Sequence, residues 1–66
     1  MTLRDLRQQK KLTQEQMAEM LGISRITVAR MEAGKASMTL HVLEGLMREF
    51  EMTYDEVKAL EMKRKT

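Results

Sequence analysis

The sequence predicts an all-α fold of five short helices, and three observations support this. Apolar residues recur at helical spacing almost throughout the chain, and no stretch alternates as a half-buried β-strand does. Thr or Ser precedes the periodic segments, where a side-chain oxygen can cap a helix. Gly22 and Gly34 follow two of these segments, where a residue able to take positive φ ends a helix.

Each predicted helix has a cap that the sequence identifies. The helices are expected over residues 3–10, 14–21, 25–33, 40 to 48 or 50, and 54–60. The predicted N-caps are Thr2, Thr13, Ser24, Thr39 and Thr53. Thr13 and Thr53 also have the spacing of a capping box, with Gln16 and Glu56 three residues further on. The fourth helix is expected to bury a stripe of Leu40, Leu43, Leu46, Met47 and Phe50.

The chain is short enough for one domain, which we expect over residues 1–62 with a basic tail over residues 63–66. Cysteine is absent, so disulfides and thiolate zinc sites are excluded. The single histidine, His41, is expected at the edge of the core and cannot form a metal site alone. Oligomerisation is the remaining way to stabilise so small a fold. No membrane segment or signal peptide is predicted, and the features fit a cytoplasmic protein.

The charges are divided along the chain. Residues 1–38 carry seven Lys or Arg against four acids, whereas residues 39–62 carry two against six. The tail adds three positive charges from residues 63–65. This division suggests that the N-terminal half faces a polyanion. The alternative is that both halves are ordinary solvated helix faces.

Residues 14–33 have the features of two helices joined by a tight turn. Gly22 can reverse the chain, and Ala18 allows the two helices to approach closely. The apolar residues that would join the helices are Met17, Leu21, Ile23, Val28 and Met31.

The run LTQEQMAEMLGIS at residues 12–24, followed by MEAGK at residues 31–35, resembles the Cro/repressor-type helix-turn-helix family. That family includes the lambdoid phage repressors and bacterial regulators of the xenobiotic-response-element type. The resemblance extends from Leu3 to about Leu60. It implies a five-helix lambda-repressor-like domain and a bacterial or phage-encoded regulator of transcription, expected to be a repressor. Such a protein binds a palindromic operator in double-stranded DNA as a homodimer, with its third helix in the major groove.

The third helix has two different faces. Val28 and Met31 share one face and are expected to point to the core. The predicted base-contacting residues on the opposite face are Arg25, Ile26, Ala29 and Arg30. Two alternatives remain open, namely that Ile26 packs on the second helix and that Arg25 contacts phosphate instead of a base.

The resemblance also assigns contacts outside the bases. It assigns phosphate contacts to Thr13 and Gln14, at the start of the second helix. Further candidates for phosphate contacts, from their positions in the chain, are Ser24, Thr27, Lys35 and Ser37. Thr27 has local capping as its alternative role. The resemblance implies an ion pair between Arg7 and Glu32, which would fix the recognition helix against the first helix. It places the dimer contact at Met52, Tyr54 and Glu56.

One departure from the family pattern concerns the end of the fourth helix. Glu51 occupies a position commonly held by Gly or Asn, so either it takes positive φ or the turn differs.

An enzyme is not expected, because the sequence contains no nucleophile–base pair, phosphate-binding glycine loop or metal cluster. No cofactor, metal or small-molecule effector is expected. The competing function is a protein-interaction module of the same fold, such as an antitoxin or an accessory factor. The operator sequence, and the choice between repression and activation, stay open.

Overall fold

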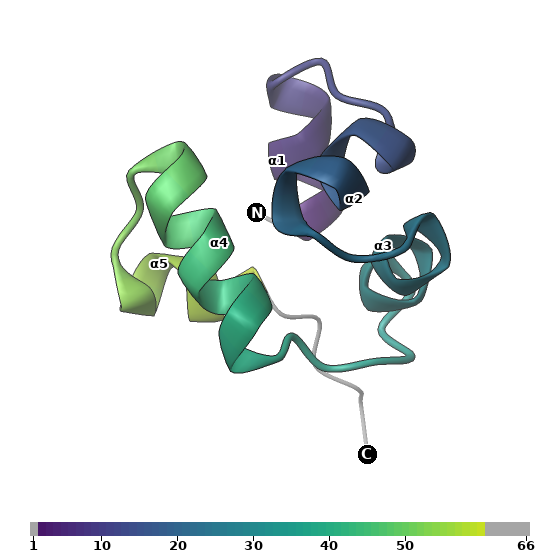
Figure 1. The fold of residues 1–66 in the computed structure, drawn as a ribbon. Coiled ribbons are helices and arrows are strands. Elements are labelled where there is room, and N and C mark those ends of the chain that lie inside the picture. Colours follow the sequence, from purple (N-terminus) through teal and green to yellow (C-terminus); the bar gives the residue numbers. More distant parts are fainter. Residues whose placement is uncertain (1, 61–66) are drawn as a thin grey trace.

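The computed structural model of the protein describes residues 2–60, which form five α-helices and no strand (Figure 1). The helices are α1 (Leu3–Gln9), α2 (Gln14–Leu21), α3 (Arg25–Glu32), α4 (Leu40–Phe50) and α5 (Tyr54–Lys58). The predicted all-α fold is therefore confirmed. The predicted basic tail at residues 63–66 lies outside the described residues. None of the described helices is long and apolar enough to cross a membrane.

All five helices begin at the predicted caps. The side-chain oxygen of each cap accepts a hydrogen bond from the backbone N–H three residues later. The predicted capping boxes at Thr13 and Thr53 are both present. A third box joins Thr2 to Asp5 at the start of α1. These local bonds satisfy amides that a helix start otherwise leaves without a partner.

The ends of α1 to α4 share one geometry, in which a backbone N–H bonds to the carbonyl five residues earlier. The residue before each such N–H has positive φ, and these residues are Lys11, Gly22, Gly34 and Glu51. Glu51 has a φ of 53°, so the first of its two alternatives holds. Lys11, with a φ of 58°, was not expected in this conformation.

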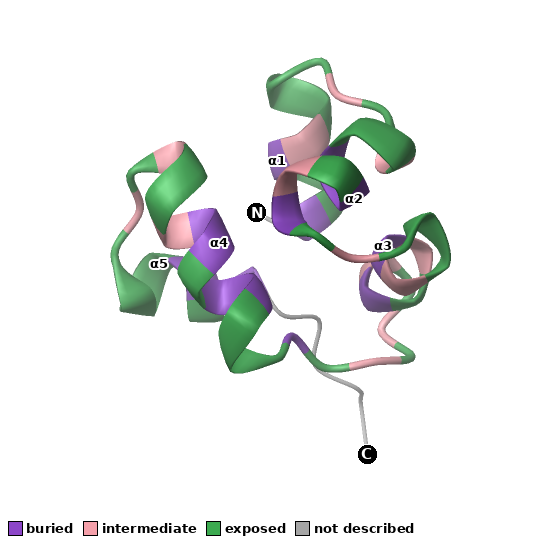
Figure 2. Cartoon of the chain, in the orientation of Figure 1, coloured by how far each residue is buried: buried purple, intermediate pink, exposed green. Residues whose placement is uncertain are grey.

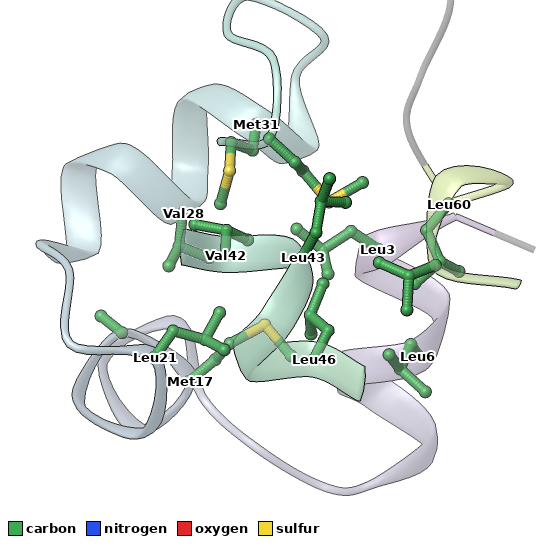
Figure 3. Close-up of a cluster of buried hydrophobic side chains, with 13 residues drawn as sticks. Leu3, Leu6, Met17, Leu21, Val28, Met31, Val42, Leu43, Leu46 and Leu60 are labelled. Carbon is green, nitrogen blue, oxygen red and sulfur yellow. The ribbon is translucent and has the colours of Figure 1, made fainter. Parts of the chain in front are cut away.

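The core lies between all five helices (Figures 2 and 3). Val28 and Met31 of α3 are buried, as the helix periodicity predicted. They lie near Val42 of α4 in the core cluster (Figure 3). The other buried apolar residues are Leu3, Leu6, Met17, Ala18, Leu21, Met38, Leu43, Leu46, Val57 and Leu60.

The predicted burial of Leu40 is wrong, because its side chain is 64% exposed. Val42, Leu43 and Leu46 define the buried side of α4. At about 100° per residue, Leu40 lies roughly a third of a turn from the centre of that stripe. Met47 and Phe50 are half-buried against the core, and Val42, which the prediction did not include, is buried.

The contacts between helices show which of them support α3. Helix α2 packs against both α3 and α4, α4 packs against α5, and α1 reaches α3. In Figure 1, α3 and α5 lie on opposite sides of the molecule, with α2 and α4 between them. Helix α3 therefore packs on α2 and α1, and its buried side chains also reach the core beside α4.

Candidate nucleic-acid interface

The outward face of α3 combines positive charge with an exposed apolar side chain. Arg25 and Arg30 are exposed, and Ala29 is half-buried. Ile26 is 64% exposed, so α2 does not shield it. The opposite face is fixed in the core by Val28. Helix α3 thus presents a rigid surface that can offer guanidinium donors and an apolar contact to the edges of base pairs.

The start of α2 lies beside this face in the fold, as Figure 1 shows. The Thr13 hydroxyl accepts from the Gln16 N–H at 3.0 Å, and the Gln16 side chain accepts from the Thr13 N–H at 2.8 Å. The backbone N–H groups of Gln14 and Glu15 take no part in this box. Two amides at the positive end of the helix dipole are the chemistry that suits a phosphate.

The side chain of Gln14 has a partner within the protein. Its Nε2 donates to Glu32 Oε1 at 3.1 Å, which ties the start of α2 to the end of α3. One hydrogen of that amide group remains for a second acceptor. The sequence did not indicate this bond, because the two residues are eighteen positions apart and no spacing rule joins them.

Ser24 and Thr27 bond to each other at the start of α3. Ser24 Oγ accepts from the Thr27 N–H at 3.1 Å, and the two hydroxyl oxygens are 2.8 Å apart. Ser24 is thus the cap of α3, and the phosphate contact of Thr27 stays a prediction. Lys35 and Ser37 are exposed in the segment between α3 and α4. The Lys35 backbone is fixed by a 2.9 Å bond from its N–H to the Arg30 carbonyl.

Arg7 and Glu32 form a close ion pair between α1 and the end of α3. Arg7 Nε lies 2.6 Å from Glu32 Oε2, and Arg7 Nη2 lies 3.2 Å from Oε1. A third guanidinium N–H donates to the Leu12 carbonyl at 2.9 Å. The hydrogen bond to Glu32 raises the pKa of Arg7, against the opposing effect of burial. Arg4 lies further from the same carboxylate, at 3.8 Å.

The residues assigned to the dimer contact lie on a different side of the molecule, at the corner between α4 and α5 (Figure 1). Tyr54 is 50% exposed, and Met52 is half-buried against the core. The Glu56 carboxylate accepts from the Thr53 N–H at 2.8 Å, so it is already used in the capping box. The predicted DNA contacts and the predicted dimer contact are thus separate surfaces.

Sequence reasoning missed a contact made by His41. Its Nε2 lies 2.8 Å from the backbone oxygen of Leu21, the last residue of α2. No periodicity or motif signals such a bond between a side chain of one helix and the end of another. Among residues 2–60, no group of three or more His, Asp or Glu is placed to hold a metal ion.

Comparisons with known proteins agree with this geometry. A family model described as helix-turn-helix matches residues 3–57. The chain is also 40% identical over 55 residues to the HTH-type transcriptional activator BcrR of Enterococcus faecalis. That match covers 83% of this chain and 27% of BcrR, so the chain spans about a quarter of the length of its relative. No solved structure matches the chain. The family match covers most of the sequence and all of α1 to α4, and the chain belongs to the helix-turn-helix family.

Proposed function

We propose that this chain is a sequence-specific, double-stranded-DNA-binding regulator of transcription that acts without enzymatic chemistry. In this proposal α3 enters the major groove, with base contacts from Arg25, Ile26, Ala29 and Arg30. Phosphate contacts come from the start of α2, from Ser24 and Thr27, and from Lys35 and Ser37. The protein binds a palindromic operator as a homodimer through the corner at Met52, Tyr54 and Glu56. DNA as the ligand also fits the expected cytoplasmic location.

The observation that carries the proposal is the two-sided character of α3. Val28 and Met31 hold one face in the core, while the other face exposes two arginines and an isoleucine. Guanidinium groups can bond to guanine edges, and an isoleucine beside them can contact a thymine methyl group in the major groove.

The direction of regulation depends on where the operator lies. The relative BcrR is named as an activator. A repressor, as first expected, needs only an operator that overlaps the promoter. The same DNA-binding surface serves both roles, and we propose the surface and not the direction.

The test is fluorescence-anisotropy binding to random duplex DNA across a salt series. We compare the wild type with the Arg25→Ala/Arg30→Ala variant. The matched control is Arg48→Ala/Lys58→Ala, which removes the same charge from α4 and α5. We expect the α3 variant to bind at least tenfold more weakly and its salt slope to fall by up to about 1.8. The control should retain most of the wild-type affinity.

Equal losses in the two variants would mean that general charge, and not α3, accounts for binding. No binding by the wild type at low salt would reject the DNA function. It would then favour the alternative, a protein-interaction module of the same fold.

A further inference from the structure

The end of α2 is held from α4 by His41. The imidazole Nε2 lies 2.8 Å from the Leu21 carbonyl oxygen. A carbonyl only accepts, so Nε2 is the donor, and a neutral imidazole can supply that hydrogen with Nδ1 left as an acceptor. The last carbonyls of a helix have no partner within it. His41 therefore provides the end of α2 with a hydrogen bond from another helix.

A second contact, one turn further along α4, involves Leu21 again. A Cβ atom added at Gly45 would lie 2.9 Å from Leu21 Cδ2, so the α4 backbone approaches Leu21 closely. His41 and Gly45 are four residues apart and share a face of α4. Helix α4 thus contacts Leu21 at two points, the backbone oxygen of Leu21 and the side chain of Leu21.

Leu21 directly precedes the turn that leads into α3. Gly22 has a φ of 71°, and a Cβ there would lie 3.4 Å from His41 Nε2. The Ile23 N–H then bonds to the Ala18 carbonyl at 2.9 Å, and Ser24 caps α3. Only residues 22–24 separate the two helices. Because only three residues join the two helices, a shift of the Leu21 carbonyl would also shift the start of α3.

We propose that His41 is a positioning residue for DNA recognition. Its hydrogen bond to Leu21 fixes the turn between α2 and α3, and so sets the angle at which α3 meets the groove. His41 needs no contact with DNA for this role. The inference rests on the proposed function. Base contacts require this alignment, whereas contacts to phosphates of any sequence tolerate a change of angle better.

Three variants separate the hydrogen bond from other effects. His41→Leu removes the donor, and His41→Gln keeps an N–H donor at a similar reach. Glu44→Leu is the control, since it adds a leucine at another exposed position of α4. His41 is itself exposed, so all three variants are expected to fold.

Binding is measured with the duplex that the wild type selects from a random pool and with a scrambled duplex. We expect His41→Leu to bind the selected duplex about three- to tenfold more weakly, as for one lost hydrogen bond. Its affinity for the scrambled duplex should stay within about twofold of the wild-type affinity. His41→Gln should match the wild type on both, and Glu44→Leu, which also removes one acid, should keep the wild-type ratio between the two affinities.

Amide hydrogen exchange tests the contact without DNA. We expect the amides of Gly22 and Ile23 to exchange faster in His41→Leu but not in the other two variants, with the amide of the fully buried Leu46 as an internal reference for global opening. If the wild type selects no duplex, the proposed function fails while exchange still reports on the turn.

The positioning role is overturned by any of three results: unchanged exchange at both turn amides in His41→Leu, unchanged affinity for the selected duplex, or equal losses on both duplexes. An equal loss in His41→Gln would also overturn it, because packing and not the donor would then matter.

Discussion

Glu32 receives hydrogen bonds from two other helices, and its side chain is only 4% exposed. Both carboxylate oxygens bond to Arg7, and Oε1 also accepts from Gln14. A carboxylate this far from water is stable only while these donors remain. The end of α3 is thereby fixed to α1 and to the start of α2 at one point.

We predict that Arg7→Ala lowers stability and DNA affinity together. The change leaves the Glu32 carboxylate without its main partner, and breaking such a pair costs about 3 kcal/mol. Urea unfolding followed by circular dichroism measures the stability, and anisotropy measures binding. A variant with wild-type stability and binding would contradict the proposed role of the pair.

Arg4→Ala is the matched control, because Arg4 is near the same carboxylate but 65% exposed. A screened surface contact contributes about 0–1 kcal/mol. The raised pKa of Arg7 means that its stabilisation is present below the unfolded pKa and is lost only as the pH rises through the folded value. The difference between wild type and Arg7→Ala should therefore stay constant from about pH 7 to pH 10.

We predict that Glu51→Gly stabilises the protein. Glu51 has a φ of 53° at the end of α4, a conformation that costs a residue with a Cβ about 1 kcal/mol. Glycine removes that strain, although it also adds freedom to the unfolded chain. Urea unfolding should show a net gain of about 0.5 kcal/mol. Glu51→Ala keeps the Cβ, so an equal gain there would point to charge and not to strain.

Single residues show where prediction from sequence stops. The positive φ of Glu51 was one of two alternatives because a family pattern marked that position. The same conformation at Lys11 has no such mark in the sequence. Leu40 was predicted to be buried because apolar periodicity alone does not show where the edge of a buried stripe lies. The bonds of Gln14 and His41 join distant helices, and only the folded chain brings those atoms together.

At the scale of helices, prediction succeeded because the signals are local. All five N-caps were identified from Thr or Ser before an apolar-periodic segment, and each now accepts its N3 amide. Helix α1 ends one residue earlier than expected, at Gln9, and α3 ends at Glu32 instead of residue 33. Such ends depend on the last hydrogen bonds, which packing decides.

We predict that Thr13→Ala and Thr2→Ala cost similar stability but differ in DNA binding. Both residues cap a helix through a capping box, and loss of such a cap costs about 1 kcal/mol. Thr13 also lies at the proposed phosphate contact of α2, whereas Thr2 begins α1. Under conditions where both variants are folded, Thr13→Ala should bind DNA about three- to tenfold more weakly. Equal affinities would exclude Thr13 from the DNA contact.

At the scale of the whole molecule, most acids of the C-terminal half lie on α4, on α5 and in the turn between them. The described acids of α4, α5 and the turn between them are Glu44, Glu49, Glu51, Asp55 and Glu56. In Figure 1, α5 and the turn before it lie on the opposite side of the molecule from α3, and α4 lies between them. A polyanion that approaches the exposed face of α3 meets Arg25 and Arg30 while the acids of α5 lie further away, and this charge distribution favours the proposed orientation.

The last prediction concerns the proposed dimer. Tyr54 is the large exposed apolar side chain at the corner between α4 and α5, and acids surround it in the sequence. Stable interfaces bury about 1,200–2,000 Å², more than one half-exposed tyrosine offers. Two such corners also repel each other. We therefore expect a weak dimer in free solution that added salt strengthens, the opposite of its effect on DNA binding.

Sedimentation equilibrium across a salt series measures this self-association, and Tyr54→Ala should abolish it. The same variant should bind a single half-site as the wild type does, because α3 is untouched. It should lose the steep, cooperative binding to the full palindrome, because the dimer contact is removed. Lys58→Ala, also on α5, is the control for changes to that helix. If Tyr54→Ala still binds the full palindrome cooperatively, the dimer contact lies elsewhere on the molecule.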